Sequence, residues 1–339
     1  MKKTKLVYIL LIFAFCIASL TACGRAEQYF VYGTTLTIKA DDARSSKDVD
    51  KVYEYINALE SLLSPTVEGS DVYNVNHAQK NVAVKCSQIT MEVALAAKVA
   101  FEQSDGAYDP SVYPLVRLWK FSGDTFGIVG QDITPPTDDE INENLKLVGF
   151  DRVFSLDFEN NTITKTIDGA MLDFGGIAKG YAVRKCLDLT SGKMLVNLGG
   201  NIGAAGKSYR IGVANPSRQD RIFSTAYYAR FELQPFECVS TSGDYERYYT
   251  SRTGESTVYY PHIIDTATGY PVDTSKDDAV VSCTIISTDG ALGDAIATAV
   301  VVLGKERGVQ LIRSLGLKGV VITSDLQCEN VGDFSLEIQ

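Results

Sequence analysis

An apolar stretch near the C-terminus, 291–303, carries a single acidic residue. Its composition predicts a helix, in which Asp294 and Thr298, four residues apart, project from the same face. A carboxylate beside a hydroxyl offers two hard oxygen ligands of the kind that Mg²⁺ binds together with substrate phosphates. The alternative is a buried Asp294 that caps backbone N–H groups, with Thr298 bonded to the carbonyl oxygen four residues before it. The stretch alone leaves both interpretations open.

A second candidate is the segment 173–182, where Gly175 and Gly176 stand between a predicted strand, 170–173, and a predicted helix. Such a junction lets backbone N–H groups approach a phosphate, and Lys179 adds positive potential at the helix N-terminus. The segment is neither a dinucleotide-binding fingerprint nor a P-loop, so an ordinary turn is an equal alternative.

Histidine occurs at only two positions, His77 and His262. His262 opens a short predicted strand, 262–265, that runs into a glycine turn and contains Asp265. A histidine in this setting is a candidate general base or phosphate contact, and a hydrogen-bonded structural histidine is the alternative. His77 stands in a polar segment and is expected to be a solvated loop residue.

The N-terminus has the pattern of an export signal. Three lysines in the first five residues precede an apolar run of 15 residues, 6–20, which is too short to span a bilayer comfortably. The run ends in small residues before Cys23 and resembles the bacterial lipobox, in which the peptide is cut before the cysteine and the cysteine is lipidated. An ordinary secretory signal with a chance cysteine is the alternative. We therefore expect a signal peptide, 1–22, and an extracytoplasmic domain, 23–339, anchored by lipid to the cell membrane.

Charge and cysteine content narrow the functional class. The formal net charge of −10 becomes −13 without the signal peptide, and no block of Lys or Arg remains, so nucleic acid is not an expected partner. An acidic body also leaves the lipid anchor as the only expected membrane contact. The cysteines beyond the signal are odd in number, widely spaced and without a Cys-x-x-Cys motif, so we expect small buried hydrophobes and no disulfide framework or zinc site. They are Cys86, Cys186, Cys238, Cys283 and Cys328.

The elements that position these residues are mixed. Apolar spacing predicts helices over 49–63, 89–102, 138–147, 291–303 and 305–315. Strands are predicted over 32–39, 170–173, 194–198, 209–214, 225–233, 237–241, 262–265 and 280–287, with a last strand around Val320. The order lacks a regular βαβ alternation and therefore predicts an α+β fold.

Taken together, the sequence resembles one family, the ApbE-type FAD:protein FMN transferases. Any one of the matching segments is weak, but they occur in the family's order and span nearly the whole chain beyond the signal. They are 32–35, 106–110 with 114–116 and 118–119, 173–182, 195–201, 212–216, 241–248, 262–271 and 294–304. Members of this family are commonly exported lipoproteins, which agrees with the lipobox.

The resemblance implies a single domain of two intimately packed lobes that binds FAD. Such enzymes cleave the FAD pyrophosphate with Mg²⁺ and attach FMN through a phosphoester to a Thr or Ser of a target protein, releasing AMP. By this resemblance Asp294, Thr298 and the carbonyl of Gly176 are Mg²⁺ ligands, and His262 is the catalytic residue. The implied FAD contacts are Tyr32, Ala107, Tyr108, Asp109, Asp173, Lys179 and the backbone of Ile264.

Two positions depart from the family pattern. Tyr32 stands where the family usually has Met, and Thr66 where it has an aromatic residue. Both substitutions change how a flavin or adenine ring packs, and neither removes a catalytic group.

Three functions compete on this sequence: FMN transfer to protein, FAD pyrophosphatase activity with water as acceptor, and flavin binding without turnover. A mere binder would not need Asp294, Thr298 and His262. Acceptors of this family resemble Ser/Thr-Gly-Ala-Ser/Thr, and this chain contains no Ser-Gly-Ala or Thr-Gly-Ala. We therefore expect the acceptor to be a separate exported or membrane protein.

Overall fold

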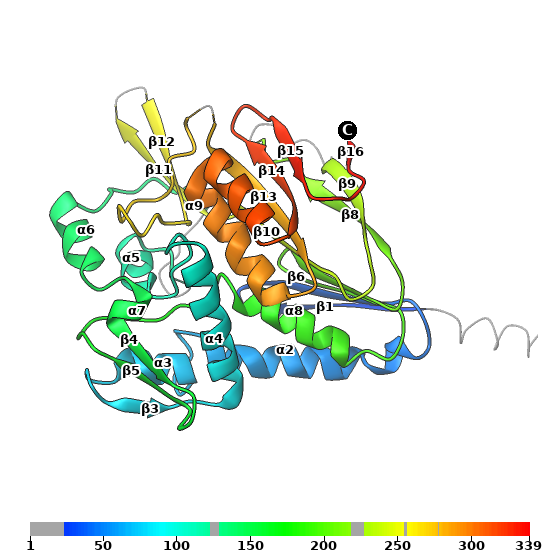
Figure 1. The fold of residues 1–339 in the computed structure, drawn as a ribbon, viewed down its shortest axis with the longest axis horizontal. Coiled ribbons are helices and arrows are strands. Elements are labelled where there is room, and N and C mark those ends of the chain that lie inside the picture. Colours follow the sequence, from blue (N-terminus) through cyan, green and yellow to red (C-terminus); the bar gives the residue numbers. More distant parts are fainter. Residues whose placement is uncertain (1–23, 123–128, 218–226, 254–255, 277) are drawn as a thin grey trace, which may run out of the picture.

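The computed structural model describes residues 24–122, 129–217, 227–253, 256–276 and 278–339. Its centre is an eight-stranded antiparallel sheet in the order β1-β2-β6-β7-β10-β13-β14-β15 (Figure 1). These strands are β1 (Arg25–Val31), β2 (Thr34–Ala40), β6 (Met194–Leu198), β7 (Asn201–Ala205), β10 (Cys238–Gly243), β13 (Val280–Ser287), β14 (Lys318–Thr323) and β15 (Cys328–Val331).

Both faces of this sheet are covered. On one face lie three helices, α2 (Val49–Leu63), α8 (Ala178–Asp188) and α9 (Gly290–Ser314). On the other lies a three-stranded sheet of β8 (Tyr209–Ala214), β9 (Tyr227–Leu233) and β16 (Glu337–Ile338). All eight residues of β13 are buried, as expected for a central strand covered on both sides.

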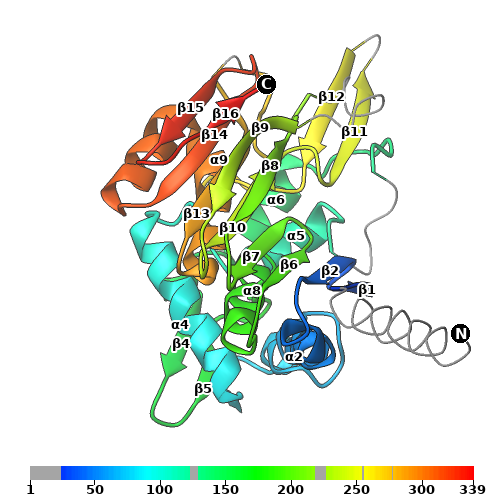
Figure 2. The same cartoon turned by 90° about the vertical axis from the view of Figure 1, so that its right-hand side faces the viewer.

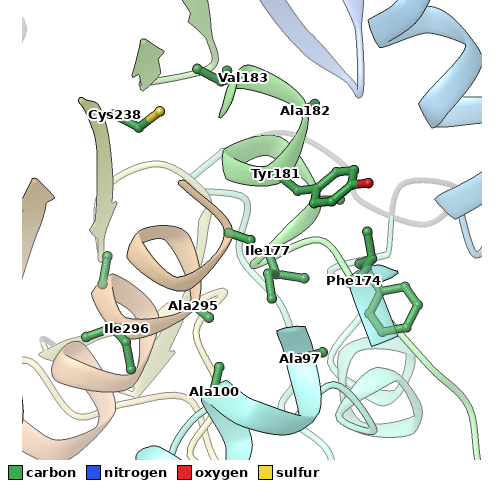
Figure 3. Packing of buried hydrophobic residues seen from close by; sticks show 14 of the residues in the cluster. Ala97, Ala100, Phe174, Ile177, Tyr181, Ala182, Val183, Cys238, Ala295 and Ile296 are labelled. Carbon is green, nitrogen blue, oxygen red and sulfur yellow. The ribbon is translucent and has the colours of Figure 1, made fainter. Parts of the chain in front are cut away.

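A second lobe packs beside the helices of the first (Figure 1). It contains the helices α3 (Asp71–His77), α4 (Gln88–Gln103), α5 (Tyr113–Leu118), α6 (Asp138–Leu145) and α7 (Phe150–Val153), with a small sheet of β3 (Ala83–Lys85), β5 (Thr162–Lys165) and β4 (Phe154–Asp157). One continuous cluster of buried residues runs through both lobes. Figure 3 shows part of it, where Ala97 and Ala100 of α4 lie near Ala295 of α9 and Ile177.

A two-stranded hairpin, β11 (Tyr248–Thr253) and β12 (Ser256–Pro261), projects from the body on the side of α5 and α6 (Figures 1 and 2). Its register pairs Tyr248 with Pro261. Arg247 precedes Tyr248 and His262 follows Pro261, so these two residues lie opposite one another at the base of the hairpin.

The α+β prediction and most of the predicted elements are confirmed. The five apolar positions that define the first helical stripe, Val49, Val52, Ile56, Leu59 and Leu63, are all buried in α2. The helices predicted over 291–303 and 305–315 form α9, whose backbone is non-helical only at Gly304, between them. The five cysteines are unpaired, and all except the half-buried Cys328 are buried.

Three local predictions are wrong. Residues 170–173 form no strand, because the side-chain amide of Asn76 takes the place of a neighbouring strand. Its Nδ2 donates to the carbonyl oxygen of Leu172 at 2.9 Å, and its Oδ1 accepts from the N–H of Leu172 at 2.6 Å. Residues 262–265 contribute only an isolated bridge between Ile264 and Pro271. His77 is exposed as expected but ends α3, where its ring stacks on Tyr73 at 3.8 Å.

The predicted signal peptide and Cys23 lie outside the described residues. Among the helices of the described ranges, none has the length and apolar character needed to cross a bilayer.

Candidate active site

Helices α8 and α9 touch through two glycines near their N-termini. A Cβ on Gly180 would lie 2.0 Å from the carbonyl oxygen of Gly290, and a Cβ on Gly290 would lie 2.4 Å from that of Gly180. A side chain at either position would therefore force the helices apart. This contact brings Asp294 to the first turn of α8, where its Oδ2 accepts a hydrogen bond of 3.0 Å from the N–H of Gly180.

Asp294 is buried with only 3% of its surface exposed. Burial raises the pKa of its carboxyl group. The positive charge of Lys179, the N–H of Gly180 and the amide of Asn201 each act in the opposite direction and lower that pKa. The helix contact thus places a carboxylate in a low-dielectric position with a cation close by.

Gly176 and Thr298 come together from the turn before α8 and from α9. A Cβ on Gly176 would lie 3.5 Å from Thr298 Oγ1, so the main chain of this turn runs directly against the hydroxyl. Thr298 Oγ1 also shares a hydrogen bond of 3.0 Å with Ser242 Oγ of β10 and lies 3.4 Å from the carbonyl oxygen of Asp294. The three predicted Mg²⁺ ligands are therefore neighbours.

The geometry contains features of both interpretations of Asp294 and Thr298. Asp294 does cap α8, and Thr298 does contact the carbonyl oxygen of Asp294. The bond from the Gly180 N–H, however, engages Oδ2 alone. Over the part of the chain that the structure describes, no group of three His, Cys, Asp or Glu side chains is arranged to hold a metal ion. One carboxylate, one hydroxyl and one main-chain carbonyl, completed by phosphate oxygens and water, nevertheless suit Mg²⁺, which rarely has an all-protein cage.

The turn before α8 is fixed by Asp173 and Lys179. Asp173 Oδ1 accepts a hydrogen bond of 2.7 Å from the N–H of Gly175, and Lys179 Nζ donates one of 2.6 Å to the Gly175 carbonyl oxygen. Burial raises the pKa of Asp173, while the charges of Lys179 and Arg247 lower it. These bonds use the N–H and carbonyl of Gly175 within the turn, and phosphate binding by 173–182 stays a prediction.

Tyr108 closes this region from the second lobe. Its ring lies 3.2 Å from the position of a Cβ on Gly176, and its buried hydroxyl has no hydrogen-bond partner among the described residues. Burial and the negative charges of Asp173, Asp294 and Asp109 raise its pKa. An unpartnered buried hydroxyl among carboxylates is a group that a ligand could satisfy.

Ala107 and Asp109, on either side of Tyr108, make packing and hydrogen-bond contacts within the protein. Ala107 is half-buried and packs against the core. The Asp109 carboxylate accepts hydrogen bonds from the N–H and hydroxyl of Ser111, at 2.8 and 2.6 Å, and from the N–H of Phe150, at 3.3 Å. Asp109 thus ties the loop that carries Tyr108 to α7, and its contact with FAD stays a prediction.

His262 is held by a single main-chain oxygen. The carbonyl of Arg247 accepts a hydrogen bond of 3.0 Å from the N–H of His262 and lies 3.2 Å from its Nδ1. Because a carbonyl oxygen can only accept, Nδ1 carries the proton and Nε2 the lone pair. Burial, with the charges of Arg247 and Lys179, lowers the pKa of His262 to about 4. The ring is therefore neutral at pH 7, as a general base must be.

Arg247 is a site residue that the sequence analysis did not identify. Its Nη2 lies 3.4 Å from the position of a Cβ on Gly33, at the tip of the β1–β2 hairpin, and its charge lowers the pKa of both Asp173 and His262. A signal was present in the sequence, since pairing the two strands of the β11–β12 hairpin places residue 247 opposite His262. Ser242, which holds Thr298, was also missed, because its role depends on packing between β10 and α9.

The remaining predicted FAD contacts are Tyr32 and the backbone of Ile264. Tyr32 adopts φ +53, bonds Glu60 Oε1 through its N–H at 2.8 Å and packs against the core. Its hydroxyl is buried without a hydrogen-bond partner among the described residues. Ile264 is buried, and the bridge to Pro271 is made through its neighbours, which leaves its own main-chain groups outside that bridge.

Thr66 lines a cavity of about 130 Å³ next to the segment that leads into Asp173. The cavity is also lined by Tyr73, His77, Tyr113, Arg117 and Met171. Its walls thus combine rings and a cation, although the aromatic residue expected at position 66 is absent.

The site has two sides. We call Gly176, Asp294 and Thr298 the helix side, and Arg247 and His262 the hairpin side. Lys179 acts electrostatically on both, since its charge lowers the pKa of Asp294 and of His262.

Comparisons with known proteins place this arrangement in a family. The ApbE family model matches residues 32–321, which include both sides of the site. The chain belongs to the ApbE family. Among its relatives, the FAD:protein FMN transferase of Klebsiella pneumoniae is 31% identical over 277 residues, which cover 80% of this chain and 79% of that protein. The FAD:protein FMN transferase of Vibrio cholerae is 29% identical over 294 residues, covering 82% and 80%.

Solved ApbE structures share the fold. The ApbE protein of Thermotoga maritima superposes with a TM-score of 0.77 and 27% identity, covering 91% of this chain and 97% of that one. The flavinyl transferase ApbE of Pseudomonas stutzeri, in its apo form, gives a TM-score of 0.71 over 91% and 95% of the two chains. Its identity of 24% supports likeness of fold alone.

Proposed function

We propose that this protein is a Mg²⁺-dependent FAD:protein FMN transferase that attaches FMN to a Thr or Ser hydroxyl of another protein and releases AMP. The observation that carries the proposal is the convergence of a neutral, main-chain-held histidine with a buried carboxylate–hydroxyl–carbonyl group around one lysine. A flavin-binding protein without turnover would need neither a positioned base nor a buried carboxylate at this place.

The helix side would hold the metal. Asp294, Thr298 and the Gly176 carbonyl are the residues that fit it, and when bound Mg²⁺ supplies positive charge to the pyrophosphate oxygens. Lys179, which lies at the N-terminus of α8, adds a second positive charge to the same phosphates.

The hairpin side would perform the proton transfer. Nε2 of His262 takes the proton of the acceptor hydroxyl as its oxygen forms a bond to the phosphorus of the FMN half of FAD. The bond from that phosphorus to the bridging oxygen breaks, and this oxygen leaves with its electron pair on AMP. The Arg247 carbonyl keeps Nδ1 protonated throughout and so fixes which nitrogen is the base.

We further propose that the acceptor is a separate exported or membrane protein with a Ser/Thr-Gly-Ala-Ser/Thr-like motif, and that this protein is lipid-anchored through Cys23 outside the cytoplasmic membrane. The lipobox-like segment and the absence of that motif from this chain support both statements.

The test uses the soluble domain with FAD, Mg²⁺ and a protein that carries the acceptor motif. Covalent flavin fluorescence in a denaturing gel, together with AMP release, is the expected result. AMP and free FMN without covalent flavin would instead establish an FAD pyrophosphatase, and no cleavage would contradict both activities. Intact mass of the enzyme incubated alone with FAD and Mg²⁺ should show no added FMN, and a gain of one FMN would refute an acceptor in trans.

A further inference from the structure

The loop that carries Tyr108 is bonded to segments next to both sides of the site. At its start, the carbonyl oxygen of Gly106 accepts a hydrogen bond of 3.1 Å from the hydroxyl of Thr266, in the segment that follows the hairpin. At its end, the carbonyl oxygen of Pro110 accepts one of 2.8 Å from the N–H of Asp173, in the turn before α8. These bonds fix the main chain on either side of Tyr108.

The Tyr108 ring presents its hydroxyl end to the helix side. Its Cε2 lies 3.2 Å, and its Cδ2 3.9 Å, from the position of a Cβ on Gly176. Because Cε2 is bonded to the carbon that bears the hydroxyl, the closer part of this edge is the part next to the oxygen. The same Cβ position lies 3.5 Å from Thr298 Oγ1. The hydroxyl end of the ring thus adjoins two of the three proposed Mg²⁺ ligands.

The Tyr108 hydroxyl has no hydrogen-bond partner among the described residues, although its side chain is buried and only 4% of the residue is exposed. A buried hydroxyl without a partner is destabilising, and such a group in a folded protein calls for an explanation. A phenol is protonated at neutral pH, so this hydroxyl is able to donate a hydrogen bond. The group it lacks is therefore an acceptor, such as an oxygen atom.

Two further buried polar atoms lack a hydrogen-bond partner within the described part of the chain and belong to the surroundings of Asp294. They are Asn201 Oδ1 of β7 and Ser240 Oγ of β10. Ser240 Oγ lies 3.8 Å from the position of a Cβ on Gly293, the residue before Asp294. The side chain of Asn201 hydrogen-bonds the Asp294 carboxylate. Unpartnered polar atoms thus gather around the proposed metal ligands, as expected where a hydrated cation binds.

We propose that the Tyr108 hydroxyl donates a hydrogen bond to an oxygen ligand of the Mg²⁺ bound at the helix side, and so positions that ligand. The oxygen belongs to water before FAD binds and to the pyrophosphate afterwards, because Mg²⁺ keeps several waters and also binds substrate phosphates. Tyr108 acts on a ligand and is not one itself, since Mg²⁺ prefers carboxylate, carbonyl and water oxygens. This inference rests on the metal site of the proposed function and gives Tyr108 a role separate from contact with FAD.

The test compares Tyr108→Phe with Tyr209→Phe. The first variant removes the hydroxyl and keeps the ring against Gly176. Tyr209 is a buried tyrosine of β8, in the small sheet on the opposite face of the main sheet from α8 and α9, so its variant is a control outside the site. The probe is Mn²⁺, which suits the same oxygen ligands as Mg²⁺. Free Mn²⁺ is measured by electron paramagnetic resonance while the metal is titrated into the protein alone and with FAD.

We expect wild type and Tyr209→Phe to bind Mn²⁺ with the same affinity. Tyr108→Phe should bind it roughly ten- to a hundredfold more weakly, the scale for a residue that hydrogen-bonds a metal ligand. Asp294→Asn, which removes the charge of a proposed ligand, is the reference for a damaged metal site. Equal Mn²⁺ affinity of Tyr108→Phe and wild type would overturn the proposal. Weaker FAD binding by Tyr108→Phe in EDTA, with unchanged Mn²⁺ affinity, would assign the hydroxyl to FAD instead.

Thermal unfolding without metal separates this role from a purely structural one. Because the hydroxyl has no partner in the metal-free protein, Tyr108→Phe should melt at or above the wild-type temperature in EDTA. A lower melting temperature there would show that the hydroxyl stabilises the fold, which contradicts the proposal.

The same titrations distinguish this inference from the proposed function. A wild type that binds no Mn²⁺ in either titration would refute the metal site and the role of Tyr108 with it. A wild type that binds Mn²⁺, loses affinity in Tyr108→Phe and transfers no FMN would refute the transferase and still support the role of Tyr108.

Discussion

Asp294 is held on a helix that touches its neighbour through two glycines, whereas His262 is held at the base of a projecting hairpin by one carbonyl oxygen. The helix side is built from the core of the molecule, and Asp294 belongs to the packing of α8 against α9. The hairpin side stands where β11 and β12 leave the body (Figure 2). Substitutions on the helix side should therefore change stability and activity together, and those on the hairpin side should change activity with little effect on stability.

The largest effect is expected for Asp294→Ala. Loss of the carboxylate removes both the proposed metal ligand and the acceptor of the Gly180 N–H, so FAD cleavage should fall on the order of 10³-fold or more. Asp294→Asn is the matched control, because its side-chain oxygen can still accept from the Gly180 N–H while the charge is gone. AMP release and thermal unfolding should show cleavage lost in both variants and stability lost mainly in Asp294→Ala. Full cleavage activity in either variant with Mg²⁺ present would remove Asp294 from the metal site.

His262→Ala tests the other side. We expect transfer to slow by roughly 10²-fold or more, the usual scale for a general base, while FAD binding and the melting temperature stay close to wild type. Single-turnover flavin transfer and FAD titration measure the two quantities separately. If binding and rate fell by the same factor, His262 would be a ground-state contact of FAD and the proton would need another acceptor.

The same contrast explains what the sequence could predict. Asp294 and Thr298 are four residues apart, so helical periodicity alone placed them on one face, and the fold class and most helices followed from similar local patterns. The contact of Gly176 with Thr298 spans more than 120 residues, and only the family resemblance indicated it. No local pattern specifies which turn meets which helix.

The hairpin side was less accessible to sequence reasoning. His262 was found because histidine is rare here, but the residue that holds it, Arg247, becomes visible only when the two strands are paired in register. The segment 170–173 looked like a strand from its apolar residues, yet the side chain of Asn76 bonds both the N–H and the carbonyl oxygen of Leu172. When a side chain makes the hydrogen bonds that a neighbouring strand would otherwise make, no periodic pattern in the sequence indicates it.

A smaller effect, measured here through stability, is expected at the glycine contact. Gly180→Ala would gain helix propensity, but its Cβ would meet the Gly290 carbonyl oxygen at 2.0 Å, so overpacking should dominate and cost about 1–3 kcal/mol of unfolding free energy. Gly293→Ala is the control on α9, since its Cβ would meet its neighbours at 3.5 Å or more. Denaturant unfolding of wild type and both variants measures the loss of unfolding free energy, which should appear in Gly180→Ala and be absent or small in Gly293→Ala. Equal stability of Gly180→Ala and wild type would show that the two helices are not fixed by this contact.

The smallest effect concerns pH and the charge state of His262. Its pKa is lowered to about 4, so the base form persists as pH falls until that value is approached. Between about pH 7.5 and about pH 5.5, ionisation of His262 should then reduce kcat/KM by only about 3%, whereas an unshifted histidine would reduce it about tenfold. The unfolded chain takes up the proton near pH 6.5, so the stability linked to this group is present above that pH and is lost as pH falls towards 4. A wild-type acid limb centred near pH 6.5 would show that His262 is solvated like a free imidazole. The hairpin would then not shield it, and the contrast between the two sides of the site would be one of position alone.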